Sequence, residues 1–341
     1  MLEVGIEKIA IWLPKNYISS KRLAEHRKIT PFDPNRLGIK SLAVPNLEDT
    51  PESMALEATK LLLEKINLNN VGKIVIATES SKDLAIPISA FLHTKLKLPT
   101  TTEHYEIKFA CIGGCYALQE SLNWLRNNPD KYAIVVCTDI ARYSQGSKAE
   151  LTQGAGAVSL LLSRKPKISI APKSTTFSEE DLTFSRPITS PYAIVDGRES
   201  IIPYIKAVTQ VYRSLKSSER FEHIIIHVPF PSIVRTALLK ILKEEKRGNE
   251  LEKCLSSSLE YPSQTGNIYT GSIFLSLASL SEDKIQQDTP LALIGFGSGC
   301  CAKGFSCRLH TLENLVSLNQ KFSERTELDG KEYDNLVYPI I

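Results

Sequence analysis

The sequence predicts an α/β protein made of two similar halves. Short apolar runs rich in β-branched residues alternate with longer segments of helical spacing, and the order strand, helix, strand occurs in both halves. Each half also ends in a segment rich in Gly and Ala. Continuous apolar strands are typical of sheets that are covered by helices on both faces. The two halves share no repeat at the level of residues, so the duplication is inferred from the order of elements alone.

The elements expected in the first half follow in chain order. The first 14 residues alternate like a strand, and the helix expected over 112–126 carries Leu118, Leu122 and Leu125 at helical spacing. The other elements of this half are strands at 73–78, 105–109, 131–139 and 155–163, and a helix over 87–97.

The second half repeats this pattern. We expect helices over 201–216, 233–245 and 272–280, and strands at 223–229 and 290–296. Residues 164–200 are rich in Ser, Thr and Pro, which predicts a loop-like connection, and 311–341 are polar, which predicts a surface helix and an extended tail. The expected division is therefore 1–165, 166–310 and 311–341.

Composition excludes several classes of protein. The chain has 341 residues, of which 42% are hydrophobic and 23% charged, as in ordinary globular proteins and unlike disordered or collagen-like chains. Its net charge of +3 provides no electrostatic footprint for nucleic acid. No apolar run approaches the roughly 18 residues that span a bilayer, and the N-terminal residues do not resemble a signal peptide. We therefore expect a cytoplasmic protein that binds neither nucleic acid nor membranes.

The cysteines indicate reduced thiols. There are seven, an odd number, and without a secretory signal this pattern fits a reducing compartment. The pairs Cys111/Cys115 and Cys300/Cys301 have spacings that are poor for zinc, so we expect no metal. Cys115 is expected to pack in the core.

Cys111 is the candidate nucleophile. It lies where the strand at 105–109 turns into a helix that begins with Gly113 and Gly114. The positive end of a helix dipole favours thiolate, and paired glycines allow a substrate to approach the backbone closely. The alternative is a buried structural Cys, which is the commonest fate of a free thiol.

Three further side chains follow predicted strands or turns. Glu79 comes after the strand at 73–78, where α/β folds place their sites, although it could equally belong to a helix cap. His227 lies in an apolar strand and is either a catalytic or a satisfied core imidazole. Asn267 is either a turn residue or an amide that orients a substrate carbonyl.

The glycine turn GFGSG (295–299) lacks the spacing of a dinucleotide fingerprint. Amides of such a turn, around Gly297 and Ser298, are better suited to stabilising an oxyanion. A nucleophile, a base, an imidazole and an oxyanion donor together fit acyl transfer through a thioester.

Eight blocks in order along nearly the whole chain resemble the hydroxymethylglutaryl-CoA synthase family of the thiolase superfamily, with the bacterial members looking most similar. The blocks are TESS (78–81), EIKFACIGG (106–114), TDIARY (138–143), TQGAGAV (152–158), VDGRES (195–200), HVPF (227–230), GNIYTGS (266–272) and GFGSG (295–299).

The resemblance implies a five-layer αβαβα thiolase-like fold with duplicated halves, a homodimer, and residue roles. Cys111 matches the nucleophile that takes an acetyl group from acetyl-CoA, and Glu79 matches the acid/base that deprotonates the acetyl methyl, a role that suits a carboxyl whose pKa is raised by burial. His227 matches the imidazole that holds acetoacetyl-CoA. Tyr143 and Asn267 match pocket residues, and the amides of Ser298 and Cys111 match the oxyanion hole. The implied enzyme is an acyltransferase of the mevalonate pathway that needs no cofactor beyond its CoA thioester substrates.

Some positions depart from the family pattern, namely Ile112, Ser185, Ser232 and the pair Cys300–Cys301. They fall where acyl groups and the CoA arm would lie, so they leave the acceptor open. A polyketide relative that acts on a β-ketoacyl chain bound to an acyl carrier protein is the main alternative. An initiating ketoacyl synthase, which has no acid like Glu79, and a catalytically inactive partner protein are two further alternatives.

Overall fold

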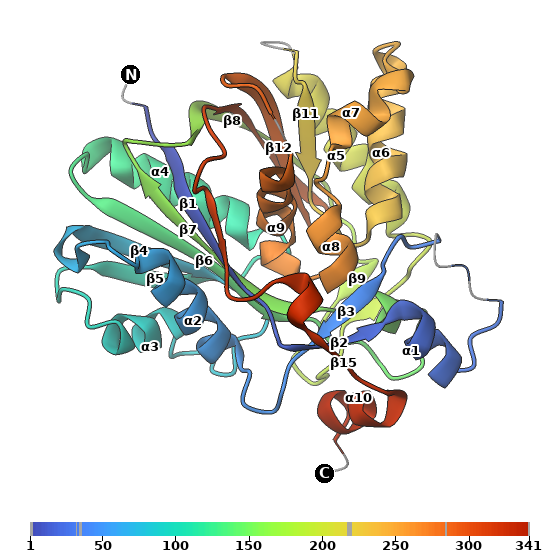
Figure 1. The fold of residues 1–341 in the computed structure, drawn as a ribbon. Coiled ribbons are helices and arrows are strands. Elements are labelled where there is room, and N and C mark those ends of the chain that lie inside the picture. The colour runs from blue at the N-terminus through green and yellow to red at the C-terminus, as the bar shows by residue number, and fades with distance from the viewer. Residues whose placement is uncertain (1–2, 32, 34–35, 217–219, 284, 340–341) are drawn as a thin grey trace.

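The computed structural model describes the chain except for residues 1–2, 32, 34–35, 217–219, 284 and 340–341. It has five layers in which helices and sheets alternate (Figure 1). Among the described residues, no helix is long and apolar enough to cross a membrane.

The sheet of the first half has the strand order β5-β4-β6-β7-β1. β5, β4 and β6 are parallel to one another. β7 is antiparallel to both of its neighbours, β6 and β1. The strands are β1 (Gly5–Trp12), β4 (Val71–Ala77), β5 (Glu103–Ile107), β6 (Tyr132–Ile140) and β7 (Ala155–Ser163).

The second half repeats this arrangement in the order β11-β12-β13-β8. β11 and β12 are parallel, and β13 is antiparallel to both of its neighbours, β12 and β8. The strands are β8 (Ile168–Ser178), β11 (His223–Ile226), β12 (Thr289–Gly297) and β13 (Cys301–Leu309). β1 and β8 thus hold equivalent places, and their short pairing at Gly5 and Ile6 joins the two halves into one hydrogen-bonded sheet.

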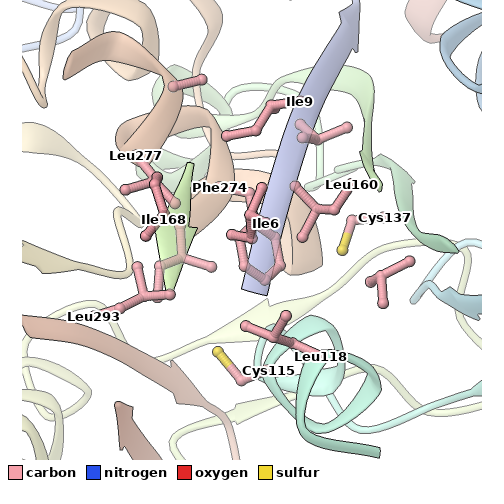
Figure 2. Packing of buried hydrophobic residues seen from close by; sticks show 14 of the residues in the cluster. Ile6, Ile9, Cys115, Leu118, Cys137, Leu160, Ile168, Phe274, Leu277 and Leu293 are labelled. Carbon is pink, nitrogen blue, oxygen red and sulfur yellow. The ribbon is translucent and has the colours of Figure 1, made fainter. Parts of the chain in front are cut away.

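Helices α4 (Gly113–Asn127) and α9 (Ser272–Ser279) form the central layer. In Figure 2, Leu118 of α4 and Phe274 of α9 lie within one cluster with Ile6 of β1 and Leu293 of β12. This central core therefore contains residues of both halves, which is why the chain folds as one unit.

The outer layers use the opposite faces of the same strands. Ile74 and Ile76 of β4 pack against α2 and α3, whereas Val75 and Ala77 face the central core. A strand buried on both faces has to be apolar at every position, which explains the continuous runs in the sequence. The covering helices are α2 (Pro51–Leu63) and α3 (Ile88–Lys95) on one side, and α5 (Ile201–Leu215), α6 (Pro231–Glu244) and α7 (Leu251–Leu255) on the other.

A smaller sheet contains β2 (Asn16–Ser19), β3 (Ser41–Val44) and β15 (Thr326–Glu327). The remaining named helices and strands are α1 (Ser20–His26), β9 (Phe184–Ser185), β10 (Ile194–Val195), α8 (Glu260–Thr265), β14 (Val316–Leu318) and α10 (Gly330–Val337). Single 3₁₀ turns occur at Leu68–Asn70, Lys148–Thr152, Gly248–Glu250, Tyr269–Gly271, Leu280–Glu282 and Phe322–Glu324.

One expectation about the fold was wrong. Residues 164–200 are not simply a loop, because β8 occupies 168–178 and pairs with both β1 and β13. The polar residues of this strand lie in its second part, which is partly exposed, so composition resembled a loop while the two neighbouring strands imposed extended backbone. The boundaries of the three-part division at 165/166 and 310/311 stay a prediction.

Candidate active site

Three candidate residues meet at one edge of the first sheet. β5, β4 and β6 are neighbouring parallel strands, so their carboxyl ends lie at the same edge. Cys111 follows β5, Glu79 follows β4, and Asp139 lies near the end of β6. Two of these residues were predicted, and Asp139 was not.

Cys111 is held in a tight turn immediately before α4. Ala110 has φ of 42°, a left-handed conformation that costs a non-glycine residue about 1–2 kcal/mol. The N–H of Gly113 donates to the carbonyl of Ala110 at 3.2 Å, which closes the turn and leaves Cys111 partly exposed. The residue as a whole is partly exposed, while its side chain packs against the cluster that contains Tyr143 and Tyr269.

The expectation that the helix dipole favours thiolate at Cys111 was wrong. The pKa of this thiol is raised well above its ordinary value, first by burial and then by the negative charges of Glu79 and Asp139. Cys111 is therefore a protonated thiol at rest, and its activation requires a nearby base.

Glu79 has the properties of such a base. Burial, followed by repulsion from Asp139, raises its pKa to about 7, while Arg186 and Lys108 act in the opposite direction. Its Oε1 atom is buried and has no hydrogen-bond partner within the part of the chain that the structure describes. A carboxyl with a pKa near 7 and a free oxygen can both accept and return a proton at neutral pH. The raised pKa of Glu79 suits the acid/base role that the family resemblance implies.

Asp139 connects the elements around the site. Its Oδ1 accepts hydrogen bonds from the N–H of Glu79 at 2.7 Å and the hydroxyl of Ser80 at 2.9 Å. Its Oδ2 accepts from the hydroxyl of Thr270 at 2.6 Å and the N–H of Thr270 at 3.1 Å. The carboxylate thus joins the end of β4 to the turn that precedes α9. The strand-end rule that selected Glu79 also applies to Asp139, so the sequence contained the signal.

Tyr143 and Asn267 lie beside the nucleophile. Tyr143 is buried in a small cluster with Tyr269 against which Cys111 packs, and the two tyrosine rings meet edge to face at 6.5 Å. Burial raises the pKa of Tyr143, and hydrogen bonds from neighbours that include Asn267 partly oppose this. The Oδ1 of Asn267 accepts from the N–H of Tyr269 at 2.9 Å and the hydroxyl of Ser272 at 2.8 Å. These contacts fix the Asn267 side chain at the start of α9.

His227 follows β11 in the second half. Its imidazole is 1% exposed, and burial lowers its pKa to about 3, so the ring is neutral at physiological pH. The Nδ1 atom is buried and unpartnered among the described residues. A buried imidazole nitrogen without a hydrogen-bond partner lowers the stability of the folded protein. Such a nitrogen is expected where a polar ligand supplies the missing partner.

The glycine turn lies against the nucleophile turn. β11 and β12 are parallel, and the N–H of His227 donates to the carbonyl of Ile294 in β12. A side chain at Gly297 would place its Cβ 2.9 Å from the backbone nitrogen of Ile112, the residue after Cys111. Only glycine permits this approach. Partly exposed Ser298 begins the turn that leads into β13, so both proposed oxyanion donors belong to neighbouring turns.

The whole chain is similar to proteins of one family. The model described as hydroxymethylglutaryl-coenzyme A synthase N terminal matches residues 2–167, and the corresponding C-terminal model matches 247–335. A hydroxymethylglutaryl-CoA synthase of Enterococcus faecalis is 30% identical, and the alignment covers 98% of this chain and 91% of that relative.

The chain belongs to the hydroxymethylglutaryl-CoA synthase family. A solved structure of MvaS in complex with 3-hydroxy-3-methylglutaryl coenzyme A has the same fold, with a TM-score of 0.90, 28% identity, and coverage of 99% of this chain and 92% of that one. The expected thiolase-like fold is thereby confirmed.

The chain is also similar to a relative that is described as an ACP synthase. The polyketide biosynthesis 3-hydroxy-3-methylglutaryl-ACP synthase PksG of Bacillus subtilis is 26% identical to the chain, over 98% of this chain and 88% of that relative.

Proposed function

We propose that this protein is an acyltransferase that condenses acetyl-CoA with acetoacetyl-CoA and releases 3-hydroxy-3-methylglutaryl-CoA and CoA, as in the mevalonate pathway. The observation that carries the proposal is the placement of Cys111 and Glu79 at the carboxyl ends of the neighbouring parallel strands β5 and β4, where the negative charge of Glu79 helps to raise the pKa of the Cys111 thiol. Family membership supports the choice of substrates.

The first step transfers the acetyl group. The sulfur of Cys111 attacks the thioester carbonyl of acetyl-CoA, CoA leaves as its thiol, and Glu79 takes the proton from Cys111. The N–H groups of Cys111 and Ser298 are the proposed donors to the tetrahedral oxyanion. The proton then passes to the departing CoA sulfur, which returns Glu79 to its ionised form.

The second step forms the carbon–carbon bond. Glu79 removes a proton from the methyl group of the acetyl thioester, and the resulting carbanion equivalent attacks the ketone carbon of acetoacetyl-CoA. Neutral His227 can donate a hydrogen bond to the ketone or thioester oxygen of this second substrate, while Tyr143 and Asn267 border the pocket. The new alkoxide takes up the proton held by Glu79.

The last step consumes water. Water attacks the thioester to Cys111, one of its protons regenerates the free thiol and the other is released to solvent, and the product leaves as a carboxylate that still carries CoA. Neither a metal nor a redox cofactor takes part in these steps, since CoA thioesters activate both acyl groups. The prediction that none is bound stays a prediction.

Mass spectrometry tests the nucleophile and the base separately. After incubation with acetyl-CoA, we expect one acetyl group on the peptide that contains Cys111, and none on that peptide in Cys111→Ala. We expect Glu79→Gln to reduce condensation much more than acetylation, so that acetyl-enzyme accumulates when both substrates are supplied. The absence of an adduct on Cys111 in the parent protein would contradict the proposal and would favour an inactive thiolase-fold partner.

The carrier-bound acceptor is a second candidate function, supported by the similarity to PksG. Ser232 stands at the start of α6, where many family members have a lysine nearby, and its hydroxyl donates to the carbonyl of Arg36 at 2.8 Å. The hydroxyl of Ser232 is neutral, so this side chain adds no positive charge that could bind the phosphates of CoA. Parallel assays with acetoacetyl-CoA and with an acetoacetyl group on an acyl carrier protein separate the two functions, because turnover with the carrier-bound chain alone would overturn our first choice.

We also propose a homodimer in the cytoplasm. β5 stands at the end of the sheet and, among the strands that the structure describes, pairs with β4 alone, so its other edge can pair with a strand of a second copy. Sedimentation velocity tests this assignment, and a species of monomer mass at micromolar concentration would contradict it.

A further inference from the structure

Tyr338, the residue after the C-terminal helix α10, contacts the backbone of the active-site segment, and Tyr333 of α10 reaches the same segment through the side chain of Gln153. This segment, residues 141–147, connects β6 to the turn at Lys148–Thr152 and carries Tyr143. It lies outside the regular strands, so its backbone groups need partners from elsewhere in the molecule.

The backbone N–H and the backbone carbonyl of Tyr143 are both hydrogen-bonded to side chains, those of Gln153 and Tyr338. The N–H of Tyr143 donates to Oε1 of Gln153 at 3.1 Å, and the carbonyl of Tyr143 accepts from the hydroxyl of Tyr338 at 2.8 Å. The Nε2 of the same Gln153 donates to the hydroxyl of Tyr333 in α10 at 2.5 Å. Gln153 and Tyr333 are 4% and 1% exposed, so water does not compete for the two bonds of Gln153, whereas the bond from Tyr338 is partly buried.

The same connection extends to the other side of the pocket. Gln153 forms a parallel bridge with Asn267, and the N–H of Asn267 donates to the carbonyl of Thr152 at 2.8 Å. Displacement of Gln153 would therefore affect both Tyr143 and Asn267.

Charged groups fix the position of α10. Arg27 of the segment after α1 lies between Glu150 and Asp334 and forms hydrogen bonds with both carboxylates. Tyr333 also donates to Oε1 of Glu150 at 3.2 Å, and Gly330 lies so close to His26 that a Cβ atom would be 2.2 Å from its ring. These contacts hold the helix in one place relative to Gln153.

We propose that Tyr338 and the Tyr333–Gln153 pair are positioning residues for the acyl pocket, acting on Tyr143 and Asn267 from outside the site. This inference rests on the proposed function for its kinetic consequence, but the holding of Tyr143 is independent of it. The C-terminal helix is thus a part of the catalytic apparatus, although none of its residues belongs to the candidate active site.

Tyr338→Phe is the sharpest test, because it removes one hydroxyl from a partly exposed ring. Tyr333→Phe is the second variant, and Tyr212→Phe is the matched control. Tyr212 is a buried tyrosine of α5 whose hydroxyl donates to Glu245 at 3.0 Å in the outer layer of the second half.

We expect hydrogen exchange to become faster in the peptide that contains Tyr143 in both test variants and to stay unchanged there in Tyr212→Phe. With acetyl-CoA and acetoacetyl-CoA, we expect KM for acetoacetyl-CoA to rise and kcat/KM to fall about tenfold, because small displacements of positioning groups have effects of this size. The final extent of Cys111 acetylation at saturating acetyl-CoA should not change.

The inference would be overturned if both test variants showed the same hydrogen exchange and the same kcat/KM as the control Tyr212→Phe. If the parent protein fails to turn over these substrates, the proposed function fails, whereas unchanged exchange at Tyr143 would refute the positioning role by itself.

Discussion

Asp139→Asn tests the electrostatic account of the site most directly. The substitution keeps the shape of the side chain, removes its negative charge, and replaces one acceptor oxygen by an NH₂ donor. In the native protein the two oxygens accept from the N–H groups of Glu79 and Thr270 and from hydroxyls of the same region. The single side-chain oxygen of asparagine can accept from only one of these two N–H groups. The other N–H then faces the NH₂ group of the asparagine, which is itself a donor.

The loss of stability follows from these bonds. One charge-assisted bond is lost and one buried N–H is left without an acceptor, which together amount to about 2–4 kcal/mol. A chain of 341 residues has an unfolding entropy of roughly 0.7 kcal/mol per degree, so we expect the melting temperature to fall by about 3–6 °C.

The pH dependence provides the more specific result. Glu79 must be ionised to act as a base, and its pKa is about 7, so the condensation rate of the parent protein should rise with pH through this region. Asp139 contributes to the raised pKa by repulsion, whereas Arg186 and Lys108 lower it. Without the charge of Asp139, the midpoint of the pH–rate profile should therefore move to lower pH.

The assay measures single-turnover condensation from preformed acetyl-enzyme between pH 5.5 and 8.5, together with thermal unfolding at pH 8. Asp283→Asn is the matched control, because Asp283 accepts from the N–H and the hydroxyl of Ser257 at 3.0 and 2.8 Å, away from the site. The control should lower stability without moving the midpoint. An unchanged midpoint in folded Asp139→Asn would refute our explanation of the Glu79 pKa.

Three other substitutions test the packing around the site. Gly297→Ala forces a Cβ atom to within 2.9 Å of the backbone nitrogen of Ile112, so we expect acetylation of Cys111 to slow by at least tenfold, measured by quenched-flow mass spectrometry; an unchanged rate would contradict the close approach of the two turns. Ala110→Gly relieves the strain of the left-handed φ of 42°, but glycine also adds conformational freedom to the unfolded chain. We therefore expect the free energy of unfolding, measured in urea, to rise by no more than about 1 kcal/mol. A lower free energy of unfolding would contradict the strain at Ala110. Arg27→Met leaves Glu150, whose side chain is 1% exposed, without its cation, so thermal unfolding should show a loss of about 3–5 kcal/mol, whereas an unchanged melting temperature would show that the pair contributes nothing.

The strands that are buried on both faces were predictable from the sequence. Strands such as β4 and β6 are apolar at nearly every position, and this pattern follows from local composition alone. β8 was missed because its second part is polar and lies in a segment rich in Ser, Thr and Pro, and its strand conformation depends on pairing with β1 and β13, which are distant in sequence. Helix α2 was not expected either, although Thr50, Pro51 and Ser53 form a complete N-terminal cap.

The candidate site divides in the same way. Cys111, Glu79, His227, Asn267 and the glycine turn were selected because each lies in or follows a recognisable strand or turn, and the motif resemblance added Tyr143. Local patterns and motifs were therefore sufficient to predict the fold class, the family and most of the candidate groups, with Asp139 as the exception.

Only the tertiary structure decided how these groups behave. The thiol of Cys111 has a raised pKa first because it is buried and then because the carboxylates of Glu79 and Asp139 lie nearby, and no local feature of its helix reveals this. Asp139 became a central residue only when β4, β6 and the turn before α9 were brought together. The role inferred for Tyr338 depends on a contact with Tyr143 across 195 positions of the chain. Charge interactions and hydrogen bonds of this kind act through space, so they are set by the packing of distant segments and cannot be obtained from the local pattern of residues.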